Sequence, residues 1–198
     1  MQKIKKVLIG THNKGKFKEI SDLLPKNIEK ISPIDLGIES PVESGKTFQA
    51  NSEIKADFFC KKSNLITLSD DSGLEIECLN GEPGIFSSRW AKKYGNYDKA
   101  MTEILKKTKE INKGSKAQFV CSLTIQWPDG KKISEVGKIQ GDISLGKKGQ
   151  NGFGYDPIFI PDGYSKTFAE MNYKEKLMLD HRFIAYKKLE KKIKIYFE

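Results

Sequence analysis

A short apolar run near the N-terminus leads directly into a polar loop and then into a segment with helical spacing. Residues 7–10 have the unbroken apolar character of a buried strand, and the apolar residues of 14–24 recur at the intervals of a helix. A strand followed at once by a helix is the building unit of α/β folds, so this feature constrains the architecture most strongly. The loop at 11–16 carries a glycine and two lysines beside a helix N-terminus, a combination typical of anion binding and also of a basic surface turn.

Strand and helix signals continue to alternate along the chain. The pattern predicts further helices over 47–62, 98–108 and 180–192. It predicts strands over 65–68, 74–79 and 155–160, and a hairpin of 117–127 with 131–136 around the turn at 128–130. No internal repeat or linker is visible, so residues 1–198 are expected to form a single domain of the α/β class. We expect a mixed twisted sheet with flanking helices, in which the hairpin region forms a second lobe and the ligand loops line a cleft between lobes.

The composition limits the classes of protein to which the chain can belong. Hydrophobic residues make up 37% and charged residues 31%, as in a soluble globular protein. No apolar run approaches the roughly 20 residues of a membrane helix, and the basic N-terminus leads into a strand and not into a signal sequence. The three cysteines are widely spaced and form neither a disulfide framework nor a zinc pattern, which predicts a reducing cytoplasm.

The net charge of +9 has more than one interpretation. It is compatible with nucleic acid, an acidic surface or an anionic substrate as the partner. Lysine runs such as the one at 190–194 are typical of a solvated face, and a basic cleft for a polyphosphate accounts for the rest without nucleic acid or a membrane. The alternative is a basic nucleic-acid-binding protein, which would need aromatic and basic residues interleaved on one surface.

Two further segments carry candidate site chemistry. Asp70 and Asp71 lie between two predicted strands, where adjacent carboxylates need a cation or a helix end to balance their repulsion. Carboxylates are the usual protein ligands of Mg²⁺, although a pair of aspartates is also typical of a solvated turn. Downstream, glycines surround two aromatic residues over 149–157, as in loops where the backbone approaches a ligand closely and a ring stacks on it.

Short motifs follow one another in a fixed order along nearly the whole chain. They are T-x-N-x-G-K at 11–16, E-x-G-x-T-F at 43–48, Asn51, K-A at 55–56, D-D-S-G-L at 70–74, G-x-P-G at 81–84, Ser88-Arg89, F-G-Y-D-P-I-F at 153–159, T-F-A-E-M at 167–171, Lys176 and His181-Arg182. This set resembles the inosine/xanthosine triphosphate pyrophosphatases, and the resemblance runs from about residue 7 to about residue 190.

The resemblance implies an enzyme that hydrolyses the deaminated purine nucleotides ITP, dITP and XTP to the monophosphate and pyrophosphate, with Mg²⁺ as cofactor. It also implies a two-lobed shape and a homodimer, for which the sequence adds only the apolar residues Ile85, Phe86 and Trp90. The same scaffold acting on another modified nucleoside triphosphate is an alternative.

The resemblance also implies roles for individual residues. Asp71 is the expected catalytic residue, with Asp70 as the alternative, and Glu43 and Asp71 are the expected Mg²⁺ ligands. Lys16 and Lys55 are expected to neutralise phosphate oxygens as point charges. The substrate-binding residues that it implies are Thr11, His12, Asn13, Lys14, Gly15, Lys16, Lys55, Ser72, Phe153, Gly154, Tyr155, Asp156, Lys176, His181 and Arg182.

The downstream members of this set are expected to recognise the base. Phe153 would stack on it, Tyr155 and Asp156 would line the base or sugar pocket, and the donors to the base edge would be Lys176, His181 and Arg182. Hypoxanthine and xanthine present an oxygen where adenine presents an amino group. Fixed donors left unpaired against adenine can discriminate by about 10⁴–10⁵-fold.

The chain departs from the family pattern at two positions. Ala50 stands where the family usually has an acid, near the third position of a helix capped by Thr47, where Glu would complete a capping box. We expect a local loss of stability there, the alternative being the loss of a charge near the metal. Asp180 replaces a usual serine before His181, and it remains a good N-cap for the last helix.

Overall fold

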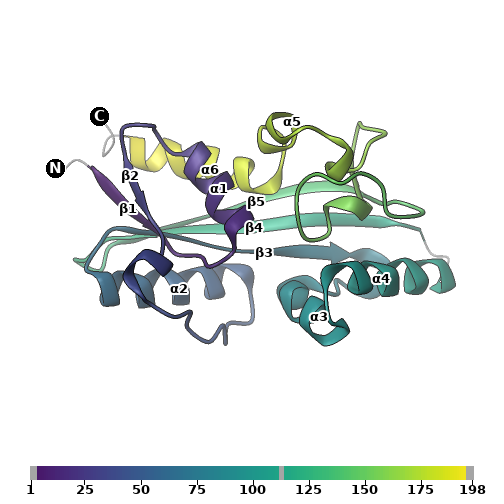
Figure 1. Cartoon of the computed structure of the whole chain (residues 1–198), viewed down its shortest axis with the longest axis horizontal. Coiled ribbons are helices and arrows are strands. Elements are labelled where there is room, and N and C mark those ends of the chain that lie inside the picture. The colour runs from purple at the N-terminus through teal and green to yellow at the C-terminus, as the bar shows by residue number, and fades with distance from the viewer. Residues whose placement is uncertain (1–3, 112–113, 195–198) are drawn as a thin grey trace. The chain divides into compact units, whose positions relative to one another are not determined.

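A computed structural model describes residues 4–111 and 114–194 of the chain, and its strands form a single mixed sheet (Figure 1). The order across the sheet is β2-β1-β3-β4-β5-β6, in which β1 is parallel to β2 and β3, while β5 and β6 are antiparallel. The strands are β1 (Lys6–Ile9), β2 (Glu29–Ile31), β3 (Thr67–Ile76), β4 (Lys116–Gln126), β5 (Lys132–Ile143) and β6 (Phe159–Pro161). The predicted α/β fold with a mixed sheet is confirmed.

Helices lie between the strands and after the last one, and the N-termini of two long helices follow capping signals in the sequence. The helices are α1 (Lys14–Leu23), α2 (Phe48–Ser63), α3 (Ser87–Tyr94), α4 (Tyr97–Ile111), α5 (Tyr173–Leu177) and α6 (His181–Ile193). Asn13 caps α1 by accepting a hydrogen bond from the amide of Lys16, and Thr47 caps α2 by accepting one from the amide of Ala50. No helix among the residues described is long and apolar enough to cross a membrane.

The chain divides into two compact units, and the division cuts through β3, β4 and β5. The first unit comprises the described residues of 1–71, 121–137 and 182–198, and the second comprises those of 72–120 and 138–181. Asp71 is therefore the last residue of its segment in the first unit, and Ser72 is the first residue of its segment in the second. Whether the chain is one domain, as the sequence predicts, stays a prediction.

Each unit has its own buried cluster of apolar residues. In the first unit, α1 and α6 lie on one face of the sheet and share a cluster with β1 and β4, while α2 lies on the other face (Figure 1). Ile9, Ile20 and Leu189 are representative of this cluster. In the second unit, α4 packs on a cluster rich in aromatic rings, in which Phe119, Phe159 and Phe168 touch one another.

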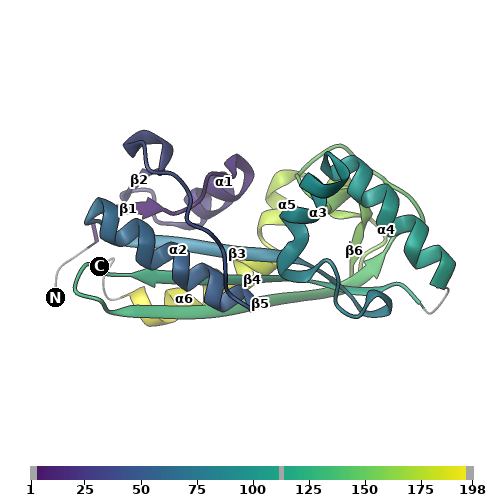
Figure 2. The ribbon, with the colours of Figure 1, turned by 90° about the horizontal axis from the view of Figure 1, so that it is seen from below.

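The hairpin prediction is confirmed. β4 and β5 are neighbours in the sheet, and the turn between them is closed by a hydrogen bond from the amide of Gly130 to the carbonyl of Trp127 (Figure 2). Gly130 has a φ of 92°, a conformation that glycine adopts without strain. β5 continues to Ile143, well beyond its predicted end at residue 136.

Two strand predictions are wrong. The strands predicted on either side of Asp70 and Asp71 are one continuous strand, β3, in which both aspartates are buried. The strand can continue there because cations balance the carboxylates, as described below. The strand predicted over 155–160 begins later, at Phe159, because Asp156–Ile158 form a 3₁₀ turn whose proline has no N–H to donate to a sheet. The sequence interpretation also missed β2, α3 and α5.

Candidate active site

Asp70 is the most deeply buried charge of the first unit, and two cations hold one of its oxygens. Lys16 Nζ lies 3.0 Å from Asp70 Oδ2, and Arg182 Nη2 donates to the same oxygen at 3.3 Å. The Arg182 guanidinium also donates to the carboxylate of Glu19, which is buried on α1. Burial by itself raises the pKa of Asp70, but the charges of Lys16 and Arg182 outweigh it and hold that pKa well below its usual range. Asp70 is therefore a firmly ionised carboxylate.

Lys16 reaches Asp70 because the start of α1 lies against β3. Gly10 ends the strand segment before the polar loop, and a Cβ atom at that position would meet Ser69 Oγ at 2.1 Å. Only glycine allows the two chain segments to approach this closely. Burial lowers the pKa of Lys16, but the carboxylates of Asp70 and Asp71 more than offset it, so that the pKa is raised. The lysine therefore stays charged.

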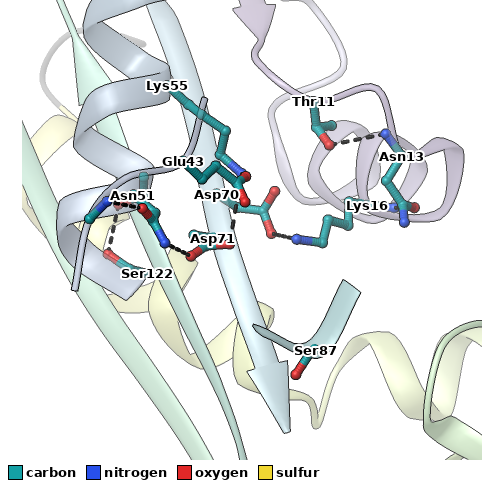
Figure 3. Close-up of polar contacts among 12 residues, drawn as sticks. Thr11, Asn13, Lys16, Glu43, Asn51, Lys55, Asp70, Asp71, Ser87 and Ser122 are labelled. Atoms are coloured by element: carbon teal, nitrogen blue, oxygen red, sulfur yellow. Dashed lines mark hydrogen bonds and ion pairs between the residues drawn. The ribbon is translucent and has the colours of Figure 1, made fainter. Parts of the chain in front are cut away.

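Asp71 contacts a neutral amide and a more distant ammonium group, whereas two cations contact Asp70. Its Oδ2 accepts a hydrogen bond of 3.0 Å from the side-chain amide of Asn51, and its Oδ1 lies 3.8 Å from Lys55 Nζ (Figure 3). Burial has the largest influence on the pKa of Asp71 and raises it, because the charge of Lys55 offsets the burial only in part. The two neighbouring aspartates thus shift in opposite directions.

Glu43 joins the same group through Lys55. Lys55 Nζ donates to Glu43 Oε1 at 2.7 Å, and both residues come from the segment that leads into and forms α2 (Figure 3). Burial raises the pKa of Glu43, but the charge of Lys55 outweighs this and lowers it. Glu43 and Asp71 are therefore two carboxylates that share one ammonium group.

The polar loop at 11–16 is organised by its own side chains. Thr11 Oγ1 accepts from the amide of Asn13 at 3.2 Å, and Asn13 Oδ1 accepts from the amide of Lys16 at 3.0 Å (Figure 3). His12 is exposed, and its Nδ1 lies 2.6 Å from Ser40 Oγ. Lys14 and Gly15 form the first turn of α1, with Lys14 exposed. The loop thus presents short polar groups and a helix N-terminus in the first unit, as the sequence predicts.

The second unit holds a buried ion pair beneath an aromatic ring. Lys176 Nζ lies 2.7 Å from Asp156 Oδ2, and each side chain is only 3% exposed. The same carboxylate oxygen accepts from the amide of Phe153 at 2.9 Å, and Lys176 Nζ lies 4.5 Å from the centre of the Phe153 ring. Asp156 thus fixes both the backbone of Phe153 and the cation against its ring. A Cβ atom at Gly152 would meet Asp156 Oδ2 at 2.1 Å, so this loop also needs glycine.

The remaining predicted base-site residues have different surroundings. His181 is buried in the second unit, where its ring stacks on Phe119 at 4.8 Å with an angle of 12° between the planes. The hydroxyl of Tyr155 donates to the carbonyl of Ser87, and its ring meets the edge of Tyr97, so Tyr155 packs in the core of the unit. Gly154 adopts a φ of 67°, and Ser72 lies half-buried in β3.

The structure therefore brings Lys16, Glu43, Lys55 and Asp71 together in the first unit and Phe153, Asp156 and Lys176 together in the second. Arg182, predicted to face the base, lies in the first unit against Glu19 and Asp70. Sequence reasoning missed Glu19 and assigned no role to Asn51. The signal for Glu19 was its position three residues after Lys16, on the same face of a helix.

Comparison with known proteins places this chain in a family. The model of the Ham1 family matches residues 7–192. A dITP/XTP pyrophosphatase of Zymomonas mobilis is 41% identical over 187 residues, which cover 93% of this chain and 90% of that protein. One from Rhodopseudomonas palustris is 41% identical over 196 residues and covers 93% of each chain.

Solved structures agree with the match. A HAM1 protein from Coxiella burnetii superposes with a TM-score of 0.87 at 31% identity, covering 98% of this chain and 100% of that one. A nucleoside-triphosphatase, dITP/XTP pyrophosphatase, from Mycobacterium abscessus has a TM-score of 0.71 at 35% identity and covers 86% of this chain and 91% of its own. The fold and the site thus define a nucleotide-handling α/β protein, and the chain belongs to the Ham1 family.

Proposed function

We propose that this protein is a dITP/XTP pyrophosphatase, which hydrolyses dITP, XTP and ITP to the nucleoside monophosphate and pyrophosphate. Water attacks phosphorus, the bond between the α- and β-phosphates breaks, and the proton of the water passes to a base. The observation that carries the proposal is the charge cluster of the first unit, where Lys55 pairs with Glu43 and Asp71 and Lys16 pairs with the neighbouring Asp70. The relatives in the Ham1 family that bear this name support the choice of substrate.

Asp71 suits the role of base better than Asp70. The cations Lys16 and Arg182 both contact one oxygen of Asp70, and the side chain is completely buried. Asp71 is held by a neutral amide, is slightly exposed, and keeps its lysine at 3.8 Å. A base must be able to accept a proton from water, which a carboxylate neutralised by two close cations does poorly. We assign Asp70 the role of holding Lys16 in place.

The residues of the first unit fit a magnesium ion. Glu19, Glu43, Asp70 and Asp71 provide four carboxylates against the three cations Lys16, Lys55 and Arg182, so the cluster has one formal negative charge in excess. No group of three or more acidic, histidine or cysteine side chains among the described residues forms a complete metal site. Mg²⁺ needs only one or two carboxylates when phosphate oxygens and water fill its other positions.

Glu43 and Asp71 are the residues that would hold the ion, with Lys55 between them. When bound, Mg²⁺ would neutralise charge on the phosphates. Lys16 and Lys55 would neutralise further charge as the pyrophosphate leaves. Thr11, Asn13 and the first turn of α1 would orient the phosphates with short donors and a positive helix end.

Recognition of the base is assigned to the second unit. Phe153 would stack on the purine, with Lys176 and His181 as donors to its edge. Lys176 is suited to this because Asp156 fixes its ammonium group beside the ring. His181 is suited because its stacking on Phe119 leaves the ring little freedom. Both are rigid donors, and rigid donors are costly to leave unpaired against adenine.

A homodimer in the cytoplasm completes the proposal. Phe86 is 45% exposed beside the turn at 81–84, where its ring is available to a subunit interface. Light scattering at micromolar concentration should give twice the chain mass of 22.4 kDa, and a mass near 22.4 kDa would contradict the dimer. A pool of dITP and XTP is found where nucleotides are used, which argues for the cytoplasm.

A panel of nucleoside triphosphates with Mg²⁺ tests the activity. We expect kcat/KM for dITP, XTP and ITP to exceed that for ATP and GTP by several orders of magnitude, with pyrophosphate as the product. Modified pyrimidine triphosphates belong in the panel because the same scaffold could act on them. Equal rates with ATP and ITP, or release of inorganic phosphate in place of pyrophosphate, would overturn the proposal.

A further inference from the structure

The loop that carries Glu43 is attached to α2 at two points. The amide of Gly45 donates to Asn51 Oδ1 at 2.8 Å, and Lys55 Nζ donates to Glu43 Oε1 at 2.7 Å. Asn51 and Lys55 are four residues apart on α2, so their side chains lie on the same face of the helix (Figure 3). One helix face therefore holds both the backbone and the carboxylate of the loop.

The same two side chains also contact Asp71. Asn51 Nδ2 donates to Asp71 Oδ2 at 3.0 Å, and Lys55 Nζ lies 3.8 Å from Asp71 Oδ1. The loop and the aspartate are thus bridged twice by α2, once through a neutral amide and once through an ammonium group. Lys55 is already placed at the phosphates, but Asn51 has no place in the mechanism described above.

The contacts fix the orientation of the Asn51 amide. A backbone N–H can only donate, so the oxygen of the amide must face Gly45 and its nitrogen must face Asp71. Asn51 is completely buried, so water does not compete for either contact. Aspartate at this position could accept from Gly45 but, when ionised, could not donate to Asp71. Serine is too short to span the two partners.

Gly45 is needed for this bridge. A Cβ atom at residue 45 would meet Asn51 Oδ1 at 2.6 Å, the Cβ of Ala50 at 2.8 Å and the amide nitrogen of Asn51 at 2.9 Å. Each distance is closer than real Cβ contacts, and two of the three involve Asn51. The loop can therefore approach α2 closely enough for the hydrogen bond only because residue 45 has no side chain.

We propose that Asn51 is a positioning residue that ties the loop of Glu43 to Asp71 and so sets the spacing of the two carboxylates. It acts through Gly45 and Asp71 and does not touch the substrate. The inference deepens the proposed function, because it takes Glu43 and Asp71 as the working carboxylates of the site. A residue that only stabilised α2 would need neither the contact with Gly45 nor the contact with Asp71.

Hydrogen exchange and kinetics on three single variants test the inference. Asn51→Ser removes both contacts, so exchange in the peptide covering 40–47 should speed up, and kcat should fall by about 10–100-fold, as for other groups that support ligand residues. Asn51→Asp should keep the slow exchange of this peptide, because it retains the acceptor, yet still lose kcat. Ser52→Ala is the matched control, since Ser52 is buried next in sequence and bonds only Gln49, Ser122 and Thr124 in the contacts described.

A double-mutant cycle with Gly45→Ala separates positioning from plain stability. If Asn51 acts through the loop, the loss of kcat in the double variant Gly45→Ala, Asn51→Ser should be close to the larger single loss. Additive losses, or an equal loss of kcat in Ser52→Ala, would overturn the inference. Unchanged exchange over 40–47 in Asn51→Ser would also overturn it.

Hydrogen exchange does not require catalysis, so it tests this inference independently of the proposed function. A wild-type enzyme that fails to hydrolyse dITP and XTP would contradict the proposed function alone. The binding of Mn²⁺ to the substrate-free protein, followed by electron paramagnetic resonance, would then still compare Asn51→Ser with Ser52→Ala. We expect weaker Mn²⁺ binding in Asn51→Ser only, and equal binding in both variants would contradict the bridge.

Discussion

The two units of the molecule bury charge in opposite ways. The first unit gathers several carboxylates and cations around the middle of β3, with more negative than positive charge, and it leaves Asp71 only loosely paired. The second unit buries the balanced pair of Asp156 and Lys176 among aromatic rings. A cluster with excess negative charge can bind a metal ion together with phosphate. A balanced ion pair under an aromatic ring provides a rigid surface instead. The comparison teaches that, if the proposed roles hold, chemistry and base recognition use different electrostatic environments in this chain.

The largest effect is expected from the carboxylate proposed as the base. Asp71→Asn should lower kcat by about 10²–10⁴-fold, because a neutral amide neither accepts the proton of water nor binds Mg²⁺ well. Steady-state kinetics at saturating Mg²⁺ would measure it, with Asp57→Asn on the exposed side of α2 as the control. Near-full kcat in Asp71→Asn would show that this residue is not the catalytic base. It would also contradict the proposal that the first unit carries out the chemistry.

A stability change should distinguish buried from exposed charge within the first unit. Arg182→Ala leaves Glu19 and Asp70 without this cation in a buried site, so the free energy of unfolding should fall by about 3–5 kcal/mol. Lys18→Ala breaks the exposed pair with Asp22 and should cost less than about 1 kcal/mol. Urea denaturation measures both, and similar losses in the two variants would show that burial does not matter here.

The same Arg182 variant tests whether this residue serves base recognition or phosphate binding. The family resemblance predicts that Arg182→Ala lowers the ITP-to-ATP ratio of kcat/KM and leaves inhibition by pyrophosphate unchanged. The contacts with Asp70 and Glu19 predict instead a weaker inhibition by pyrophosphate through Lys16. A retained ratio with weakened inhibition would assign Arg182 to the phosphate side.

A smaller effect is expected from the ring of the second unit. Phe153→Ala removes the surface on which the purine would stack, worth about 1–3 kcal/mol per base, so KM for dITP should rise by about 5–150-fold. Inhibition by pyrophosphate should change little, because pyrophosphate has no base. Phe153→Tyr should retain the stacking and serves as the control. A large loss of pyrophosphate inhibition in Phe153→Ala would contradict the separation of roles.

The smallest effect concerns the helix end beside the charge cluster. Ala50→Glu would add the missing half of a capping box opposite Thr47, which should raise the free energy of unfolding by about 0.3–1.5 kcal/mol. We expect kcat and the Mg²⁺ requirement to stay within about threefold, since Ala50 is outside the proposed ligand set. A much lower Mg²⁺ requirement would show instead that an acid at this position adds to the charge of the metal site.

Several elements could be predicted from the sequence because the information is local. The helix that begins after Asn13, the helix capped by Thr47 and the hairpin around Gly130 all follow from residues within a few positions of one another. The grouping of Lys16, Glu43, Lys55 and Asp71 came from the family resemblance, and the structure places these residues in one cluster. Their assigned roles remain predictions.

Other features could not be predicted because they depend on partners distant in the sequence. A pair of aspartates indicates a turn until Lys16 and Arg182 are brought against them, and only then can β3 run straight through. The same holds for Asn51, whose motif position carried no role until Gly45 and Asp71 were found on either side of its amide. Local sequence determined many of the helices, the hairpin and the family of this protein. The tertiary structure alone decided which charges are buried together, because the energy of a buried charge depends on its neighbours in space and not in sequence.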